Sequence, residues 1–188
     1  MRIELVILDI DGVMTDGRKY YGPDGIPAYK TYCDKDFTAI KRIKGSGVPV
    51  CFLSGDENIN KEMAKNRNIP FYSARGVDKA KFIDKLSEDF NTSPERMVYV
   101  GDDLFDLSML KSVGYPFCPS DSCSEVLHYC SGIDLCWTKD WECDVSAIIN
   151  RPGGSNVIEE LFNILFNHDL IDGCSMDDIE NLDKREVF

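Results

Sequence analysis

Residues 3–17, Ile-Glu-Leu-Val-Ile-Leu-Asp-Ile-Asp-Gly-Val-Met-Thr-Asp-Gly, decide the fold of this chain. The aliphatic run over residues 5–8 predicts a strand that is buried on both faces, as in a parallel sheet. Asp9 and Asp11 follow at its carboxyl end, and Gly12 lets the chain turn. Ligands of open α/β sheets bind just beyond the carboxyl ends of the strands. One aspartate there could be a solvated strand end, but two aspartates with three matching segments downstream favour a functional site.

Length, composition and charge limit the kinds of protein that this chain can be. Its 188 residues suit one domain with a sizeable core, and an apolar content of 43% argues against disorder. The formal net charge of −12 argues against nucleic acid and anionic membrane surfaces as partners. No apolar run approaches the length of a membrane span, and the first residues lead into a strand without a signal peptide. We therefore expect a cytoplasmic protein.

The eight cysteines include no Cys-x-x-Cys pair, and only two histidines could join them as ligands of a soft metal. Zinc sites usually show closer and more regular spacings than the cysteines between residues 118 and 143. Free thiols in a reducing compartment are the favoured interpretation, and a zinc site is the less favoured alternative.

Strand-like and helix-like segments alternate along the chain. After the first strand, we expect strands over residues 48–53, 69–72, 97–100, 115–118 and 133–137. The spacing of apolar residues predicts helices over residues 36–44, 57–66, 79–90, 107–113, 125–129 and 156–167. This alternation predicts an α/β fold, a three-layer α/β/α sandwich with a mostly parallel sheet.

Two segments stand outside that alternation. Residues 18–32 place a Gly-Pro-Asp-Gly turn at 22–25 between aromatic-rich stretches, which predicts a β-hairpin. It is either a plain surface hairpin or a flap beside the site, and the residues do not decide between the two. Residues 168–188 are acidic and predict a surface appendage, so the domain itself is expected to span residues 1–167.

Residues that follow three later strands suit phosphate chemistry. Ser54 and Gly55 precede a helix, where a hydroxyl and backbone N–H groups can bind a phosphate. Lys79 near a helix start is electrostatically unusual, because cations are unfavourable there. The strand over 97–100 is followed by more acids than helix capping needs: Asp102, Asp103 and Asp106.

If these strands are neighbours, acids crowd at one edge of the sheet: Asp9, Asp11, Asp102 and Asp103. Carboxylates so close repel one another unless a cation intervenes, and a site made of oxygens favours Mg²⁺. Together with Ser54 and Lys79, the set indicates phosphoryl chemistry. A carboxylate that the metal does not fully engage could then be the nucleophile.

In chain order, these segments match the four motifs of the haloacid dehalogenase superfamily: Asp9-Ile-Asp11-Gly-Val-Met-Thr-Asp-Gly17, Ser54-Gly55, Lys79 and Gly101-Asp102-Asp103-x-x-Asp106. The resemblance spans residue 3 to about residue 167 and implies the Rossmann-like core of that superfamily. The opening motif resembles the branch of 3-deoxy-D-manno-octulosonate 8-phosphate phosphatases and their relatives that act on nine-carbon keto sugar acids. An acid at position 11 implies a phosphoric monoester hydrolase, since dehalogenases of the superfamily lack it.

The resemblance also implies a role for each matching residue. Asp9 would attack phosphorus and form an aspartyl-phosphate, while Asp11 would protonate the leaving oxygen and then take a proton from water. The phosphoryl-binding residues would be Ser54, Gly55 and Lys79. The Mg²⁺ ligands would be the side chains of Asp9 and Asp102 and the backbone carbonyl of Asp11. The residues that orient metal-bound waters or the lysine would be Asp103 and Asp106.

The gaps between the motifs leave no room for a cap domain of ordinary size. The hairpin and one helix fill the first gap, and a helix and a short strand fill the second. Capless relatives form homotetramers in which a neighbour's hairpin or C-terminal segment closes the pocket. The resemblance therefore implies a homotetramer here.

Residues that would read the substrate depart from the family pattern. Asp56 follows Ser54-Gly55 where relatives have Arg or Glu, and Phe37 follows Asp36 in place of Gly. The candidates for substrate contact are Asp36, Asp56 and Arg75. The substrate stays open between a 3-deoxy-D-manno-octulosonate 8-phosphate-like compound, a nine-carbon acylneuraminate-type 9-phosphate and another small metabolite phosphate. A non-catalytic oligomerisation module, of the kind appended to sugar-nucleotide synthetases, is disfavoured because the phosphoryl-site residues are complete.

Overall fold

The structure is a computed structural model that describes residues 2–133 and 145–187. Its strands are β1 (Leu5–Leu8), β2 (Tyr20–Tyr21), β3 (Pro27–Tyr29), β4 (Val50–Ser54), β5 (Phe71–Ser73), β6 (Met97–Val100), β7 (Tyr115–Pro119) and β8 (Ile148–Ile149). Its α-helices are α1 (Asp34–Gly45), α2 (Asn58–Asn66), α3 (Ile83–Phe90), α4 (Leu107–Leu110), α5 (Ser124–Ser131), α6 (Val157–Asn167) and α7 (Met176–Asp183). Short 3₁₀ helices are η1 (Lys79–Phe82), η2 (Pro94–Arg96) and η3 (Leu104–Asp106).

The main sheet has the strand order β5-β4-β1-β6-β7-β8, and every neighbouring pair is parallel. β1 therefore lies between β4 and β6 in the middle of the sheet. Leu8 pairs with both Phe52 and Val100, so β1, β4 and β6 end at the same edge. The residues that follow these three strands are brought together there, as the sequence predicted.

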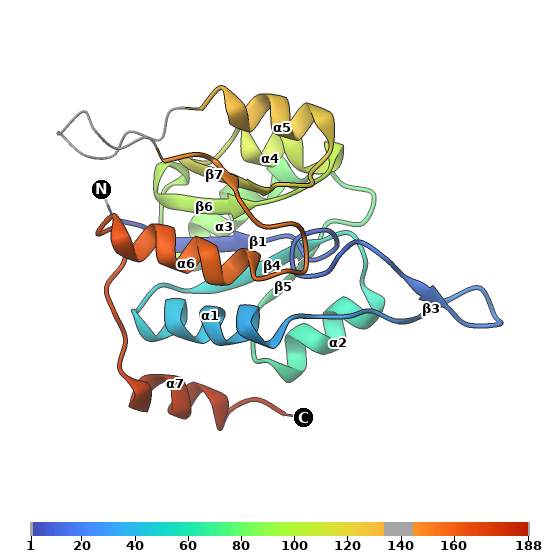
Figure 1. Ribbon diagram of the computed structural model, residues 1–188, viewed down its shortest axis with the longest axis horizontal. Coiled ribbons are helices and arrows are strands. Elements are labelled where there is room, and N and C mark those ends of the chain that lie inside the picture. The colour runs from blue at the N-terminus through green and yellow to red at the C-terminus, as the bar shows by residue number, and fades with distance from the viewer. Residues whose placement is uncertain (1, 134–144, 188) are drawn as a thin grey trace.

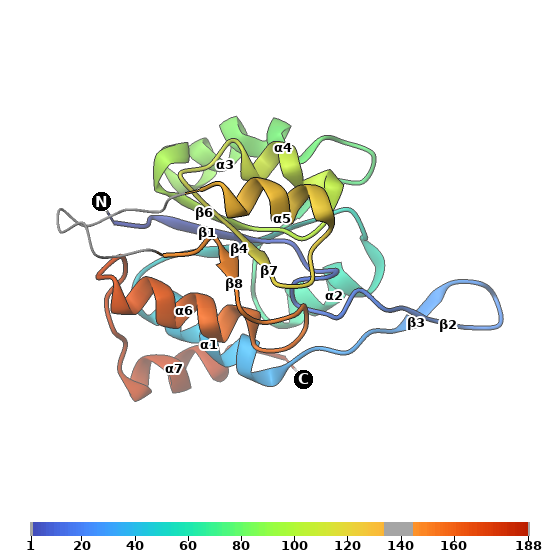
Figure 2. The ribbon, with the colours of Figure 1, turned by 45° about the horizontal axis from the view of Figure 1, so that its top comes forward.

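Helices cover both faces of the sheet (Figures 1 and 2). α3, α4 and α5 lie on one face, α1, α2 and α6 lie on the other, and α7 packs against the outer side of α1. β1, β4, β6 and β7 are buried along their whole length, which explains why they read as continuous apolar runs. The predicted three-layer α/β/α fold is confirmed.

Three local features differ from the expectation. The helix predicted over residues 79–90 starts as η1 and becomes α-helical only at Ile83. β8 forms at the sheet edge from two residues that carry no strand pattern. The strand predicted over residues 133–137 lies outside the described residues except for Ile133, which is in no strand.

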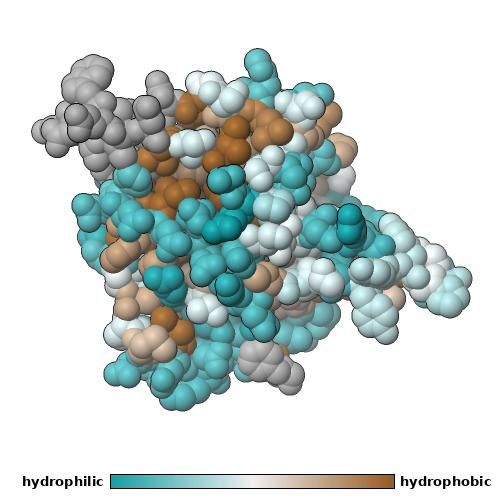
Figure 3. All heavy atoms as spheres, viewed as in Figure 1, coloured by the Kyte–Doolittle hydropathy of each residue, from teal (hydrophilic) through white to brown (hydrophobic). Residues whose placement is uncertain are grey.

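The hairpin predicted over residues 18–32 is formed by β2 and β3. It projects from the body of the molecule on the side where β1 ends, and the space-filling view shows it as a protrusion (Figures 1 and 3). Three of its tyrosines are more than half exposed: Tyr20 at 58%, Tyr21 at 64% and Tyr29 at 73%. The hairpin therefore exposes several aromatic side chains on a protrusion whose surface is otherwise largely polar (Figure 3).

The acidic tail is packed against the domain. Lys41 of α1, of which only 7% is exposed, forms ion pairs with Asp183 and Glu186, and Arg67 pairs with Glu186 at 2.7 Å. These ion pairs attach the end of the tail to α1 and to Arg67, while α7 itself lies on the surface and has no buried residue. The domain boundary expected at residue 167 stays a prediction. Among the described residues, no helix has the length and apolar character needed to cross a membrane.

Candidate active site

A cavity of about 1140 Å³ opens at the carboxyl edge of the sheet. Its lining includes most of the predicted site residues: Asp9, Asp11, Ser54, Gly55, Asp56, Arg75, Lys79, Asp102, Asp103 and Asp106. Asp36 is the predicted site residue that does not line it. The cavity therefore joins residues that are up to 97 positions apart in the chain because their strands end side by side.

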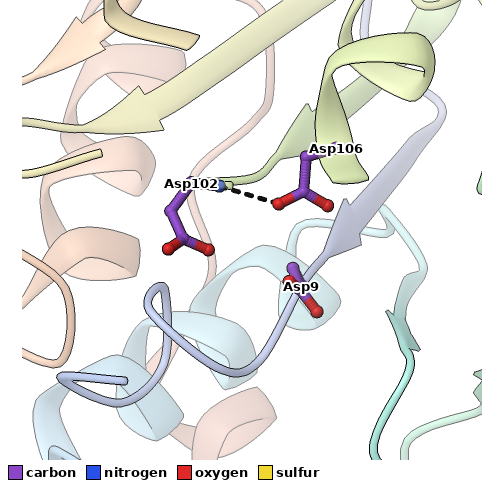
Figure 4. A group of neighbouring side chains, drawn as sticks. All are labelled: Asp9, Asp102 and Asp106. Atoms are coloured by element: carbon purple, nitrogen blue, oxygen red, sulfur yellow. Dashed lines mark hydrogen bonds between the residues drawn. The ribbon is translucent and has the colours of Figure 1, made fainter. Parts of the chain in front are cut away.

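Three aspartates meet at the base of this cavity (Figure 4). Asp9, Asp102 and Asp106 each present a carboxylate oxygen, and these oxygens lie within 4.8 Å of one another. Lys79 Nζ lies 2.9 Å from Asp9 Oδ2 and 2.5 Å from Asp106 Oδ1. The lysine, only 6% exposed, thus joins the nucleophile candidate to the third acid.

Asp106 is saturated by hydrogen bonds from protein groups. Its Oδ1 accepts from the Tyr99 hydroxyl as well as from Lys79, and its Oδ2 accepts the backbone N–H groups of Asp102 and Asp103 at 2.9 and 3.0 Å. A carboxylate engaged in this way holds the loop and the lysine in place. That Asp106 orients Lys79 for the reaction stays a prediction.

Asp9 and Asp102 have free oxygens that a metal could use. Oδ1 of each is buried and has no hydrogen-bond partner. Burial raises the pKa of Asp102 to about 8, with the charges of Asp9 and Asp106 adding to the effect. Burial likewise raises the pKa of Asp9 to about 6, against the lowering effect of Lys79. Two buried, crowded oxygen donors without partners fit a hard divalent cation such as Mg²⁺.

Gly12 makes this close approach of the acids feasible. Its φ of +84° lies in the left-handed region, and a Cβ atom at this position would lie 2.0 Å from Asp102 Oδ2. The turn after the first two aspartates therefore requires glycine for both conformation and space.

Asp103 has a different environment from the other acids of its loop. Its side chain accepts a hydrogen bond from the Leu104 N–H at 2.7 Å and caps η3. The residue is exposed at the rim of the cavity. The structure thus shows a capping role, while the predicted orientation of metal-bound waters remains a prediction.

The predicted phosphate-binding residues Ser54 and Gly55 lie at the end of β4. Ser54 is 2% exposed, and its Oγ accepts a hydrogen bond from Asn60 Nδ2 at 3.2 Å. The hydroxyl keeps its own proton available for donation into the cavity. A Cβ atom on Gly55 would meet nothing within 4 Å, so its backbone borders open space.

The structure adds a group of residues around Asp11 that sequence reasoning missed. Lys30 follows β3 and lies 2.7 Å from Asp11 Oδ1, while Asn60 Nδ2 donates to Asp11 Oδ2 at 3.0 Å. Lys19 lies 3.0 Å from Asp56 Oδ2. The base of the hairpin therefore borders the site, which favours the flap interpretation over a plain surface hairpin. A lysine at each end of the hairpin was the available signal.

The three residues predicted to contact the substrate lie in three different environments. Asp36 is fully buried, and its Oδ1 accepts the N–H groups of Ile158 and Glu159 at the start of α6. Asp56 lines the cavity, and despite partial burial its hydrogen bonds from Lys30 and Lys19 lower its pKa to about 2. Arg75 is exposed at the cavity wall. Asp36 is therefore placed as a helix cap, and only the other two can reach a ligand in the cavity.

Within the described residues, no second group of His, Cys, Asp or Glu side chains is close enough to hold a metal ion. The six cysteines of these residues are free thiols: Cys33, Cys51, Cys118, Cys123, Cys130 and Cys174. Two cysteines of the stretch considered for zinc, Cys136 and Cys143, lie outside the described residues.

Comparison with known sequences points to one family. A sequence model of haloacid dehalogenase-like hydrolases matches residues 57–134. The 3-deoxy-D-manno-octulosonate 8-phosphate phosphatase KdsC of Haemophilus influenzae is 30% identical over 121 residues, which are 64% of this chain and 67% of that protein. The enzyme of the same name from Salmonella typhi is 30% identical over 122 residues, and 64% of its length is covered. The matched region thus spans about two thirds of these relatives.

Solved structures agree with the sequence comparison. The cobalt-bound form of the deoxy-D-mannose-octulosonate 8-phosphate phosphatase of H. influenzae superposes with a TM-score of 0.75 at 25% identity and covers 89% of each chain. A probable YrbI family phosphatase from Pseudomonas syringae gives a TM-score of 0.74 at 29% identity, with 88% of this chain and 86% of that one covered. The similarity therefore extends over the sheet and both helical layers.

Proposed function

The chain belongs to the haloacid dehalogenase-like hydrolases, and from this premise we propose that it is a Mg²⁺-dependent phosphatase. It hydrolyses the phosphomonoester of a small sugar or keto sugar acid through an aspartyl-phosphate. The observation that carries the proposal is the state of Asp9 at the base of the cavity. One of its oxygens pairs with Lys79, and the other is buried without a partner beside Asp102.

In the first step, a carboxylate oxygen of Asp9 forms a bond to phosphorus while the bond to the leaving oxygen breaks. Asp11 gives its proton to that oxygen. In the second step, water attacks phosphorus, Asp11 takes the proton of the water, and phosphate leaves as Asp9 is restored. Lys79 and the Ser54 hydroxyl hold the phosphoryl oxygens during both steps.

Mg²⁺ would be held by Asp9, Asp102 and the backbone carbonyl of Asp11, and when bound it supplies positive charge against the phosphoryl oxygens. Asp106 keeps Lys79 directed at the site, because its own hydrogen bonds fix it to the loop after β6.

The substrate class is proposed from the relatives and from the cations of the cavity. The two curated relatives act on 3-deoxy-D-manno-octulosonate 8-phosphate by name. Arg75 and Lys19 line the cavity apart from Lys79, and either can meet a substrate carboxylate. This supports a keto sugar acid phosphate of that kind or a nine-carbon acylneuraminate-type 9-phosphate.

The experiment is release of inorganic phosphate from a panel of substrates with Mg²⁺ and with EDTA. The panel contains 3-deoxy-D-manno-octulosonate 8-phosphate, an acylneuraminate 9-phosphate, neutral sugar phosphates and 4-nitrophenyl phosphate. We expect Mg²⁺-dependent turnover with the highest kcat/KM on a keto sugar acid. A neutral sugar phosphate as the best substrate would overturn the substrate class alone. Absence of turnover on the whole panel would favour a non-catalytic oligomerisation module.

We also propose a homotetramer in which a neighbour covers the open cavity. The exposed tyrosines of the hairpin support it, as do two exposed apolar side chains at the cavity rim, Leu104 at 54% and Phe105 at 79%. Sedimentation velocity should give a tetramer, and activity per subunit should fall when the protein is diluted below its dissociation range. A fully active monomer would contradict the assembly.

A further inference from the structure

We propose that Lys30 is a positioning residue that fixes the carboxylate of Asp11 for its two proton transfers. Lys30 follows the last strand of the hairpin, and its side chain has 0% exposure although the hairpin projects into solvent. It cannot touch a ligand in the cavity from there, so any effect on the reaction is transmitted through the groups that it contacts. The inference rests on the proposed function, because it assigns a task to a partner of the proposed acid.

The ammonium group of Lys30 has as many partners as it has protons. Nζ donates to Asp11 Oδ2 at 3.0 Å, to Asp56 Oδ2 at 2.8 Å and to Asn60 Oδ1 at 2.9 Å. An ammonium has three donors and no acceptor, so these three acceptors use all of them. A lysine whose donors are all used is held in one position, and its contact with Asp11 restricts the orientation of that carboxylate.

Asn60 completes the arrangement by donating to the same oxygen of Asp11 as Lys30. Its Nδ2 donates to Asp11 Oδ2 at 3.0 Å and to Ser54 Oγ at 3.2 Å, and its Oδ1 accepts from Lys30 and from Tyr32. The amide is fully buried with all four hydrogen bonds made. Asp11 is thus held by Lys30 and Asn60, and the same amide touches the proposed phosphate-binding serine. Fully satisfied buried networks of this kind are rigid.

Lys19 provides a contrast within the same hairpin. It is also a lysine near the two acids, but its side chain is 28% exposed and its Nζ lies 3.9 Å from Asp11 Oδ2. It pairs with Asp56 at 3.0 Å and borders the cavity. The two lysines therefore differ in environment, since the buried one contacts the acid directly and the other one pairs with Asp56 at the border of the cavity.

Accurate placement matters because Asp11 must reach the leaving oxygen. General acid catalysis contributes about 10²–10⁴-fold, and it contributes most when the leaving group is a poor one. A misplaced Asp11 should therefore slow the loss of a weakly acidic phenol more than the loss of a strongly acidic one. This difference separates positioning of the acid from general damage to the fold.

The test compares phenyl phosphate with 4-nitrophenyl phosphate, which share a ring and differ in the acidity of the released phenol. kcat/KM is the quantity to measure, because it covers the steps up to departure of the leaving group. In Lys30→Met, we expect kcat/KM to fall at least about tenfold more for phenyl phosphate than for 4-nitrophenyl phosphate. Lys30→Arg, which keeps the charge and the donors, should restore part of this ratio. Lys35→Met, the same change at an exposed position of α1, should leave both values unchanged.

A double-mutant cycle shows whether the effect passes through Asp11. Added to Asp11→Asn, Lys30→Met should change the ratio between the two substrates no further. Equal losses on both substrates in Lys30→Met, or a ratio change that persists in the Asp11→Asn background, would overturn the positioning role. If Lys30→Met does not fold, Lys30→Met with Asp56→Asn removes one charge of each sign and is expected to show the same ratio. Phosphatase activity that Asp9→Asn leaves intact would instead overturn the proposed function.

Discussion

Asp9, Asp102 and Asp106 have identical side chains but different hydrogen-bond partners. These partners determine whether each carboxylate is available to a metal ion. Asp106 has protein donors on both oxygens, so it is a structural anchor. Asp9 has one paired oxygen and one without a partner, whereas Asp102 has a buried oxygen that no protein group satisfies. A divalent cation would therefore bind Asp9 and Asp102 rather than Asp106. The raised pKa values of these two residues have the same origin, because burial and neighbouring negative charge disfavour their ionised forms when no cation is bound.

The raised pKa of Asp102 predicts how the stability of the metal-free protein depends on pH. Between about pH 4, the ordinary pKa of an aspartate, and about pH 8, the folded protein holds more protons at this residue than the unfolded chain. The free energy of unfolding should therefore fall as the pH rises through this window. Thermal melts in EDTA should show a decreasing Tm, and Asp102→Asn should flatten the curve.

Mg²⁺ should reverse this trend, because it binds the ionised carboxylates and only the folded state gathers them. The increase in Tm on adding Mg²⁺ should be larger at about pH 8 than at about pH 5. A Tm that rises with pH in EDTA, or a Mg²⁺ effect that Asp102→Asn leaves intact, would be inconsistent with the proposed metal site.

Some residues that line the site could be predicted from the sequence and others could not, and the difference has a physical cause. The aspartates at 9, 11 and 102 could be predicted because each follows a buried strand, and parallel strands end together. Lys30 and Asn60 could not, since one follows an exposed hairpin and the other lies within α2. Their contact depends on how the hairpin returns to the domain, and no spacing along the chain encodes that path.

At the scale of elements, α6 is tied to α1 by one buried side chain. Asp36, in the first turn of α1, accepts the N–H groups of Ile158 and Glu159 at 2.8 and 3.1 Å. The first turn of a helix has unsatisfied N–H groups, so this carboxylate acts as a cap supplied by a neighbouring helix. The two helices are also in extensive contact along their length.

Asp36→Ala should therefore destabilise the protein and leave substrate binding intact. Loss of a buried acceptor for two N–H groups is expected to lower the free energy of unfolding by about 1–3 kcal/mol in chemical denaturation. Asp36→Asn keeps one acceptor oxygen and should lose less. KM should stay at the wild-type value in both. A raised KM without loss of stability would instead restore Asp36 as a substrate contact.

The strands that are buried along their whole length were predicted well, whereas the short edge strand β8 was not. The strand predicted over 97–100 matches β6, because a central strand must be apolar throughout. β8 consists of two residues at the sheet edge, too short to carry a periodic pattern. The helix expected from residue 79 begins as η1, where Lys79 is drawn into the site by Asp9 and Asp106.

On the scale of the whole molecule, the end of the acidic tail contacts the helices of the domain. Glu186, whose side chain is 6% exposed, contacts Lys41 at 3.2 Å and Arg67 at 2.7 Å, and the Val187 N–H donates to the Asn66 carbonyl. The tail thereby connects α1 with α2, and the loop before α2 carries the proposed phosphate-binding residue Gly55. The acidic composition of the tail is typical of a solvated surface. Only the ion pairs in the structure show that the tail is attached to the domain.

Glu186→Ala should leave the buried Lys41 and the partly buried Arg67 each with one ion-pair partner fewer. Removing one member of a buried ion pair costs about 3 kcal/mol, and we expect a loss of this order in the free energy of unfolding. Glu180→Ala, an exposed acid on α7, is the matched control and should have no measurable effect. Equal stability of the two variants would show that the tail is not anchored through this contact.

The central claim is that a divalent ion gathers the strand-end carboxylates and leaves Asp9 able to accept a phosphoryl group. The most direct measurement is mass spectrometry of peptides from protein acid-quenched during turnover of 4-nitrophenyl phosphate with Mg²⁺. The peptide that contains Asp9 should gain the mass of one phosphoryl group, and neither EDTA-treated protein nor Asp9→Asn should show it. A phosphoryl group on another residue, or undiminished phosphate release by Asp9→Asn, would contradict the claim.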